Sequence, residues 1–515
     1  MEKIFKELEF KSLIDRAKKL FLQEETKIRE TPGVGASLTP GVEENFGLKE
    51  PDKEEIKKIG IALWLLSSEN TNPTFEDILS YANTSSFMEA KDKILKEIDE
   101  KKLKYVYEEI ELPLLPIIKK AEERGVLLNV EYLKDLSKEY KKKSAIIEKE
   151  IYKLSGQDFN INSPKQLSEI LYSKLNLSSK GLKKTAGGSL STRESEIIKL
   201  RDQHPIIEKI LEYRELQKLL STYIDPLPGL VDQNNRLHTS LNQTGTTTGR
   251  MSSSNPNLQN IPIRGEFGGA IRKSFITTPG YKWVACDYSQ IEMRVLALLS
   301  EDENLINFFK RGEDIHSGVA SFVFGVPQDK VTGEMRRKAK TINFGIIYGM
   351  GVNALKASLG CSREEAQIFY NNYFEKFPKV KNYFDKIKQE AEKKGYTKTL
   401  FGRRRYFPAL KSKLPFLKAG AERMAMNAPL QGTAADIIKI AMKKIDEEIK
   451  KNNLEGKFSL LLQVHDELIF EAEESVALEG ANLIKRVMEN AVESRIIFGA
   501  NAYIGDNWAE LKPVN

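Results

Sequence analysis

Two apolar segments that end in carboxylates place the strongest constraint on the fold of this chain. The segment 281–288 (YKWVACDY) is a run of strand-forming residues with Asp287 near its end. The segment 458–474 (FSLLLQVHDELIFEAEE) predicts two strands joined by a tight turn at His465 and Asp466. A carboxylate at the end of a buried strand is costly unless it is paired or binds a cation. We therefore expect a small sheet that carries acidic residues on neighbouring strands.

The rest of the chain is mostly helical in pattern. Residues 1–30 predict a charged amphipathic helix, residues 31–50 a Pro- and Gly-containing linker, and the region up to about 105 a small helical unit. Leu and Ile at helical spacing continue from about 110 to 225, interrupted at 178–192 by a basic, Gly-containing loop that is either a phosphate-binding tip or an ordinary solvated loop. Residues 300–450 are again mostly helical.

Size and composition exclude several classes of protein. At 515 residues the chain is too long for one core and predicts two to four domains. The net charge of +7 is compatible with a nucleic-acid partner without requiring one. Two cysteines provide neither a disulfide framework nor a metal cluster, and no apolar run approaches the ~20 residues of a membrane span. The N-terminus lacks a signal-peptide pattern, so a cytoplasmic protein is expected.

A stripe of side chains spaced four residues apart suggests a ligand. Arg336, Lys340, Phe344 and Tyr348 fall on one face of a predicted helix, with two cations followed by two aromatic rings. This order suits a nucleoside triphosphate, with its phosphates at one end and its base at the other. A surface helix with a solvated basic end and a buried aromatic end would give the same pattern.

The carboxylates suggest a metal. Asp287, Asp466 and Glu467 are hard oxygen ligands of the kind that Mg²⁺ prefers, and Mg²⁺ takes substrate phosphates as further ligands. Two such ions about 4 Å apart activate a 3′-hydroxyl and stabilise a leaving pyrophosphate. For Asp287 alone the alternative is a cap on the helix that follows it, whereas His465–Glu467 in a strand turn has no comparable structural explanation.

Several segments in one order resemble the motifs of family A DNA polymerases, the bacterial DNA polymerase I family. They are DYSQIEMR (287–294), RRKAKTINFGIIYG (336–349), QVHDE (463–467), TGRMSSSNPNLQNIPIR (248–264), GEDIHS (312–317), LFGRRRYFP (400–408) and NAPLQGTAADIIK (427–439). The resemblance covers roughly residues 105–515. It implies an α+β right-hand fold, with an antiparallel palm sheet, a helical thumb and helical fingers.

The resemblance also implies a domain order. We expect an inactive remnant of a 3′–5′ exonuclease-type domain at 1–105, palm entry at 106–140, thumb at 141–225, palm at 226–305, fingers at 306–425 and palm at 426–515. The only Asp-x-Glu before residue 105 is Asp52-Lys53-Glu54, which predicts a solvated helix start, and the alternating pattern of an exonuclease sheet is missing. Neither proofreading nor 5′-nuclease activity is expected.

The resemblance assigns roles to single residues. Asp287 and Asp466, with Tyr288, hold two Mg²⁺ ions, for which Mn²⁺ substitutes, and Glu467 supports them. Lys340 also protonates the pyrophosphate. The remaining nucleotide-binding residues are Arg336, Phe344, Tyr348, His316, Gln290 and Glu292, and the DNA-binding residues are Arg250, Gln431, His465, Asn260 and Arg404.

Two of these roles set substrate choice. Glu292 resembles a steric gate that pairs with Tyr348 and excludes a ribose 2′-hydroxyl, and Phe344 in place of tyrosine implies rejection of dideoxynucleotides. Arg403 and Arg405 join Arg404 as candidate phosphate contacts, with a solvated basic turn as the alternative.

The expected function is template-directed DNA synthesis by a monomer that binds primer–template DNA and dNTPs, associates with the nucleoid and has a possible reverse transcriptase side activity. A single-subunit RNA polymerase, disfavoured by Glu292, and a catalytically dead DNA-binding paralogue are the alternatives.

Overall fold

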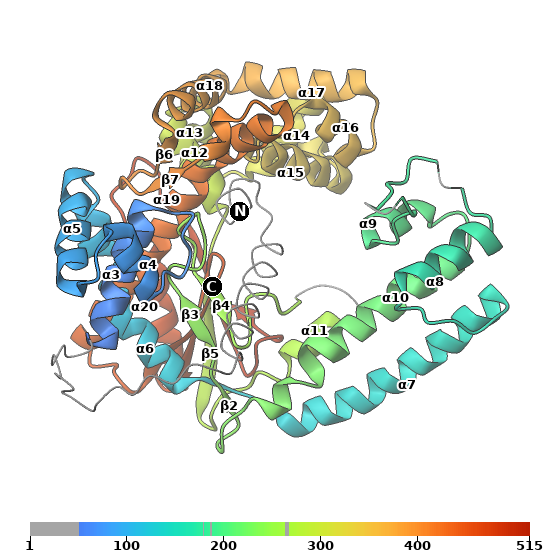
Figure 1. The fold of residues 1–515 in the computed structure, drawn as a ribbon, viewed down its shortest axis with the longest axis horizontal. Helices are drawn as coiled ribbons and strands as arrows, with labels where there is room; N and C mark the ends of the chain where they lie inside the picture. The colour runs from blue at the N-terminus through green and yellow to red at the C-terminus, as the bar shows by residue number, and fades with distance from the viewer. Residues whose placement is uncertain (1–50, 179, 186–187, 263–266, 515) are drawn as a thin grey trace, which may run out of the picture. The chain divides into compact units, whose positions relative to one another are not determined.

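A computed structural model describes residues 51–178, 180–185, 188–262 and 267–514. The predicted helix at 1–30 and the predicted linker at 31–50 lie outside these ranges. The fold class is α+β, as expected, with one five-stranded antiparallel sheet and three two-stranded ones among many helices (Figure 1). Among the described helices, none has the length and apolar character that crossing a membrane requires.

The five-stranded sheet has the order β11-β10-β5-β9-β8. The two segments that the sequence predicted as strands are adjacent in it, because β5 pairs along its length with β9. The predicted turn at His465 and Asp466 joins β8 to β9. The strand bounds are β5 Tyr281–Tyr288, β8 Phe458–Val464, β9 Glu467–Glu473, β10 Ala500–Gly505 and β11 Lys512–Pro513.

The sheet separates two hydrophobic cores. Side chains alternate along β5, so that Val284 and Cys286 enter one core while Trp283 and Ala285 enter the other. Helix α20 (Ala477–Glu489) packs on the first face. By the same alternation Asp287 lies on the second face, at the end of the strand.

Three helices form a unit with its own core at residues 53–105. They are α3 (Lys53–Leu66), α4 (Phe75–Ala82) and α5 (Phe87–Glu100), and this part of the chain contains no strand. Asp52 caps α3 by accepting a hydrogen bond from the Glu54 backbone N–H at 3.3 Å, so the Asp-x-Glu is the exposed helix start that was predicted. The helical prediction for this region is confirmed.

Long helices dominate the region from 106 to 230. Helix α7 lies alongside α10 (Figure 1), and their shared core extends to the second face of the sheet. The elements are η1 (Val106–Glu111), α6 (Leu114–Arg124), β1 (Val126–Leu127), α7 (Val130–Ser155), α8 (Pro164–Ser168), η2 (Glu169–Lys174), α9 (Glu194–Ile197), η3 (Ile198–Leu200), α10 (Ile206–Leu219), η4 (Leu220–Ile224) and η5 (Leu227–Gly229).

A short hairpin leads back to the sheet. Strands β3 (Ser240–Asn242) and β4 (Ser252–Ser254) pair antiparallel, and the connection between them carries Arg250. Strand β2 (Arg236–Leu237) and helix α11 (Gly268–Arg272) flank this hairpin.

Residues 291–451 are mostly helical and include the segment with the cation and aromatic stripe. Helix α15 carries the cation and aromatic stripe and packs on α14. The elements are α12 (Ile291–Ser300), α13 (Glu303–Lys310), α14 (Ile315–Phe324), η6 (Gln328–Lys330), α15 (Gly333–Ile347), α16 (Val352–Leu359), α17 (Arg363–Lys376), α18 (Pro378–Lys394), β6 (Tyr396–Lys398), β7 (Arg404–Tyr406), η7 (Pro408–Lys411) and α19 (Pro415–Lys451).

Candidate active site

Three carboxylates lie at one end of the sheet. Asp287 on β5 is the direct cross-strand partner of Glu467 on β9, so the two side chains share a face. Asp466 lies in the adjoining turn, and its backbone carbonyl accepts a hydrogen bond from the Tyr288 N–H at 3.1 Å. His465 reaches this turn with a left-handed φ of 55°. The turn geometry thus holds both predicted metal-binding aspartates side by side.

Nearby cations offset the charges of these carboxylates only in part. Burial raises the pKa of Asp287 to about 7, and the negative charges of Glu467 and Asp466 add to the effect. Burial also raises the pKa of Glu467 to about 7 and shifts the pKa of Asp466 upwards, with Arg272 and Arg250 opposing these shifts only in part. Carboxylates with raised pKa values that face one another are typical of a functional site.

Glu471 on the same strand provides a contrast. Its side chain is 1% exposed, yet Arg124 and Arg236 form ion pairs with it at 2.5 and 3.1 Å, and the Thr278 N–H donates to it. Although burial opposes them, the Thr278 N–H and these arginines hold the pKa of Glu471 below its ordinary value. The fold therefore neutralises a structural acid on this strand, whereas the acids at the strand end are paired more weakly, with Arg250 3.8 Å from Asp466.

A divalent cation fits this donor set. A cation beside Asp287 and Asp466 would offset the burial that raises both pKa values and the like-charge repulsion that adds to the shift at Asp287. Among the residues that the structure describes, no three His, Cys, Asp or Glu side chains meet as a ready ligand set. Further oxygen ligands would come from water, a substrate or the main chain, which is the usual mode for Mg²⁺. The Tyr288 hydroxyl donates to the Met488 carbonyl at 2.8 Å in the core, so at Tyr288 only the main chain remains for such a role.

The helix-capping alternative for Asp287 is wrong. The N-cap of α12 is Gln290, which has a φ of 56° and makes no side-chain capping bond. Asp287 lies three residues earlier, within β5. Its position at the strand end is therefore not explained by helix capping.

Arg250 connects the carboxylates to Glu292. The Arg250 guanidinium donates to Glu292 at 2.8 Å and lies 3.8 Å from Asp466. Glu292 is 5% exposed, and within the described residues its second oxygen, Oε2, is buried without a hydrogen-bond partner. Burial and the Glu292 charge raise the pKa of the Tyr348 hydroxyl to about 12. The predicted proximity of Glu292 and Tyr348 is thus present in the structure.

The two cations of the α15 stripe are exposed, as the triphosphate interpretation requires. Arg336 forms a two-pronged ion pair with Asp314, from Nε at 2.6 Å and Nη2 at 3.2 Å. Asp314 also caps α14 through the Ser317 N–H, and against the effect of partial burial Arg336 and Ser317 lower its pKa to about 2. The sequence analysis assigned no role to Asp314, although it lies in GEDIHS (312–317), one of the segments that resemble family A motifs.

In the aromatic half of the stripe Phe344 is partly buried, whereas Tyr348 is exposed. Lys340 lies over the Phe344 ring at 5.9 Å, and the His316 ring lies 5.9 Å from the same ring. His316 is buried, its Nδ1 lies 2.9 Å from Asn343 Nδ2, and burial lowers its pKa to about 4. At neutral pH His316 is therefore uncharged and contributes hydrogen bonding rather than a positive charge.

The other predicted contacts lie on several elements. Gln431 is on α19, and the exposed Asn260 accepts a hydrogen bond through its backbone carbonyl from the Tyr223 hydroxyl at 2.7 Å. Arg404 donates to the Lys101 carbonyl at 2.6 Å and stacks on the Tyr396 ring, so part of its donor capacity is already used. These roles in DNA binding stay predictions.

Arg403 is not a surface residue, so both sequence interpretations of it are wrong. It is 4% exposed and forms ion pairs with Glu111 and with Asp436. Lys439 donates to Glu111 at 2.6 Å, and Trp64 lies beside both cations. The four side chains belong to η1, the β6–β7 connection and α19. Their ion pairs therefore link segments that are far apart in sequence, since Arg403 follows Glu111 by 292 residues. We call this group the buried ion cluster (Glu111, Arg403, Asp436 and Lys439).

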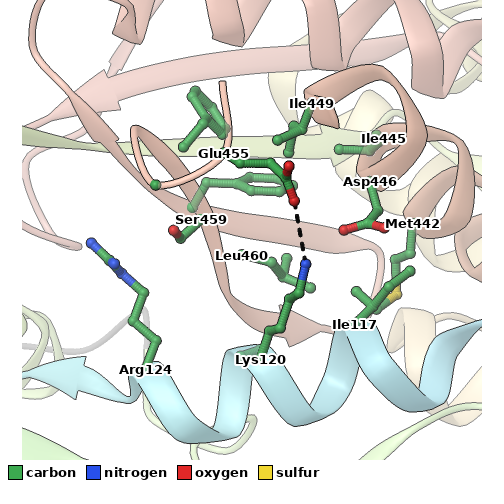
Figure 2. A pocket seen from close by; sticks show the side chains of 14 residues that line it. Ile117, Lys120, Arg124, Met442, Ile445, Asp446, Ile449, Glu455, Ser459 and Leu460 are labelled. Atoms are coloured by element: carbon green, nitrogen blue, oxygen red, sulfur yellow. Dashed lines mark ion pairs between the residues drawn. The ribbon is translucent and has the colours of Figure 1, made fainter. Parts of the chain in front are cut away.

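A separate cavity of about 270 Å³ lies at the other end of the β8–β9 hairpin (Figure 2). It is bounded by α6, the end of α19 and the start of β8, and Lys120 and Glu455 approach to 3.6 Å across it. Its walls include Phe458 and Leu460, whereas Asp466 follows the opposite end of β8. This cavity is not part of the carboxylate site.

Comparison with known proteins identifies the family. The model of DNA polymerase family A matches residues 130–510. The chain belongs to DNA polymerase family A. The family A relatives include the thermostable DNA polymerase I of Thermus aquaticus, which is 48% identical over 414 residues, 80% of this chain and 49% of the relative. DNA polymerase I of Caldicellulosiruptor bescii is 43% identical over 471 residues, 88% of this chain and 54% of the relative.

A solved family A structure gives the same fold. The polymerase domain of Pol1 from M. smegmatis, in complex with DNA primer–template and dNTP, superposes with a TM-score of 0.83 at 35% identity. The match covers 88% of this chain and 81% of that one. The right-hand polymerase fold implied by the motifs is thereby confirmed. This chain spans about half the length of the curated family A relatives named above.

Proposed function

We propose that this chain is a DNA-directed DNA polymerase, which extends a primer 3′-hydroxyl with dNTPs and releases pyrophosphate. The observation that carries this proposal is a set of half-buried carboxylates with raised pKa values, whose charges nearby arginines offset only in part. They are Asp287, Asp466 and Glu467, at the end of the central sheet. Family membership and the relatives' names support the reaction class.

We propose that Asp287 and Asp466 hold two Mg²⁺ ions, with the Tyr288 main chain as a further ligand and Mn²⁺ as a substitute. When bound, the metal supplies activation of the 3′-hydroxyl and stabilisation of charge on the leaving pyrophosphate. The chain's own part is to keep the two carboxylates adjacent, which the β5–β9 pairing and the turn at His465 support. Glu467 supports the same site from the next position.

The cationic part of α15 is assigned to the triphosphate. Arg336 offers a planar fork that suits phosphate oxygens, and it would exchange its carboxylate partner, Asp314, for the substrate. Lys340, which is exposed, would donate a proton to the leaving pyrophosphate or offset its negative charge. His316, neutral at pH 7, would donate a hydrogen bond near the phosphates, and Gln290 would contact the nucleotide.

Nucleotide choice is assigned to three side chains. Glu292 and Tyr348 face each other beside Arg250, which leaves little room for a 2′-hydroxyl. Phe344 lacks the hydroxyl whose presence relaxes selection against dideoxynucleotides in the family, so Phe344→Tyr should increase their use.

Arg250 and Gln431 would contact the minor-groove edge of the terminal pair, where every correct pair offers acceptors. His465, Asn260 and Arg404 are the remaining DNA contacts that we propose.

The domain assignment follows the same proposal. We assign palm entry to 106–140, thumb to 141–225, palm to 226–305 and 426–515, and fingers to 306–425. The part of residues 1–105 that the structure describes is a helical unit whose Asp-x-Glu is an exposed helix start, which supports the absence of proofreading by this unit. The partners are primer–template DNA and dNTPs, and the chain acts as a monomer in the cytoplasm, at the nucleoid.

A primer-extension assay tests the proposal. The purified chain is given DNA and RNA templates, dNTPs or rNTPs, and Mg²⁺, Mn²⁺ or EDTA. We expect dNTP-dependent extension on DNA that requires a divalent cation and is lost in Asp287→Ala and Asp466→Ala, while Glu474→Gln, at an exposed acid next to β9, retains it. Extension with rNTPs alone would favour an RNA polymerase, and no extension under any condition would favour a dead paralogue. Extension on the RNA template would establish the reverse transcriptase side activity.

A further inference from the structure

The connection between β3 and β4 holds Arg250, the residue that touches both Glu292 and Asp466. We call residues 243–250 the arginine loop. Within this loop Thr246 Oγ1 donates to the Arg250 backbone carbonyl at 2.7 Å. The main chain at Arg250 is therefore fixed by a side chain four residues earlier, and the guanidinium position depends on where Thr246 lies.

Thr246 is in turn held by the N-terminal helical unit. The indole Nε1 of Trp64, on α3, donates to the Thr246 carbonyl at 2.9 Å, across 182 residues of sequence. Trp64 is 2% exposed and lies within the core of α3–α5. A buried indole N–H needs an acceptor, so this bond is costly to lose.

A second contact joins the same unit to the same loop. The Asn72 N–H donates to the Thr244 carbonyl at 3.1 Å, and the Thr244 hydroxyl donates to Asn72 Oδ1 at 3.1 Å. Asn72 adopts a left-handed φ of 51°, which aims its N–H at the loop. The loop is therefore bonded to the unit at Thr244 and again at Thr246.

On its side away from the helical unit, the arginine loop packs closely against Arg403 and α19. Gly249 has a φ of +91°, and a Cβ there would lie 2.9 Å from the Arg403 side chain. A Cβ on Gly432 of α19 would lie 3.1 Å from the Thr248 carbonyl. The buried ion cluster fixes Arg403, and Gln243 at the start of the loop donates to Glu111 of that cluster at 2.8 Å. The arginine loop is held between this cluster and the helical unit.

We propose that residues 53–105 act as a positioning element for Arg250, with Trp64 as the positioning residue. The unit would contribute no catalytic group. It would fix the position of the Arg250 guanidinium, which contacts the primer terminus. This inference rests on the proposed polymerase function. It predicts that a change in the unit, remote from substrate, alters the rate of nucleotide addition through Arg250.

The test is a double-mutant cycle in the full chain. Trp64→Phe keeps the ring and removes the donor, and Thr246→Val removes the hydroxyl at nearly constant volume. Each should lower kcat on a matched primer by about 3- to 10-fold, the scale of one hydrogen bond, and leave dNTP KM and duplex Kd within about 2-fold. In an Arg250→Ala background, Trp64→Phe should change kcat by less than about 2-fold, because coupled residues are not additive.

Two matched variants separate positioning from general loss of structure. Thr246→Ser keeps the hydroxyl and should retain kcat. Tyr81→Phe removes a side-chain hydrogen bond to Glu97 at 2.8 Å inside the same helical unit, and it should leave kcat unchanged even where it lowers the melting temperature.

The failure of this inference is distinguishable from failure of the proposed function. If the unsubstituted chain extends the primer and Trp64→Phe has the same kcat, or loses equal activity with and without Arg250, the positioning role is overturned. Absence of extension by the unsubstituted chain would overturn the proposed function and this inference together.

Discussion

Asp287 and Glu467 are direct partners across β5 and β9, two acids of like charge at one register position of a buried sheet. No fold needs such a pair for its stability, because cross-strand partners of like charge repel each other. Burial raises the pKa of both residues to about 7, and at Asp287 this repulsion adds to the effect, so the pair is costly when ionised and favours a bound cation.

Removing one charge should stabilise the metal-free protein. In EDTA at pH 8 we expect Asp287→Asn to raise the free energy of unfolding by on the order of 1–3 kcal/mol, because a buried charge with a raised pKa opposes folding. The same variant should lose the rise in melting temperature that Mg²⁺ gives the unsubstituted chain. Urea denaturation with and without Mg²⁺ measures both effects, and an undiminished Mg²⁺ response would contradict the metal assignment.

The raised pKa values also determine the pH dependence. The folded carboxyls hold protons up to about pH 7, whereas unfolded ones release them near pH 4. Their contribution to stability is therefore greatest below about pH 4, falls as pH rises to about 7 and is level above it. Because metal binding requires the ionised form, the apparent Mg²⁺ affinity should increase from pH 6 to pH 8. Mg²⁺ titrations of primer extension at fixed dNTP measure this, and a flat profile would contradict it.

Lys340→Ala should lower kcat and raise dNTP KM together, reducing kcat/KM on the order of 100-fold, because charge on the leaving group grows in the transition state. Lys338→Ala is the control, since Lys338 is on the same helix and pairs with Glu334 at 2.9 Å. Single-turnover kinetics separate the two constants. A change in KM alone would assign Lys340 to binding only.

Glu292→Ala should relax ribonucleotide exclusion, because it opens the space between Arg250 and Tyr348. It also leaves the Arg250 guanidinium without its carboxylate at 2.8 Å, so extension with dNTPs should slow as well. The ratio of kcat/KM for dNTP and rNTP measures the first effect. An unchanged ratio would show that Glu292 is not the gate.

The buried ion cluster should dominate local stability. Glu111→Gln leaves Arg403 and Lys439 buried with fewer negative partners, and we expect it to lower the free energy of unfolding by about 3–5 kcal/mol. Glu109→Gln, two residues away, breaks an exposed pair with Lys443 and should cost less than about 1 kcal/mol. Urea denaturation compares the two variants, and equal effects would show that burial of the cluster adds nothing.

Local patterns were sufficient to predict the elements that carry the chemistry. The apolar runs of β5 and β8–β9 and the spacing of Arg336, Lys340, Phe344 and Tyr348 are visible within a few residues of sequence. β10 was missed because ANAYIG has little apolar alternation, although it lies directly beside Asp287 at Asn501.

Contacts between distant segments could not be predicted. Asp314 lies in one of the motif segments, but its ion pair with Arg336 depends on the packing of α14 on α15, which the sequence does not reveal. Arg403 sits in a basic run that suggests an exposed turn, and its burial depends on Glu111, 292 residues earlier. The bond from Trp64 to Thr246 spans 182 residues. A single sequence contains no local signal for such pairs.

The position of β5 in the sheet has a consequence for synthesis. Its two hydrogen-bonded neighbours, β9 and β10, follow it by about 180 and 210 residues. Non-local pairing of this kind is slow, and a ribosome adds ~5–20 residues per second, so β5 waits about 10–40 seconds for its neighbours. Throughout that interval Asp287 has no Asp466 or Glu467 beside it. A nascent chain therefore cannot assemble the complete metal site that we propose until almost all of the helices between these strands have been made.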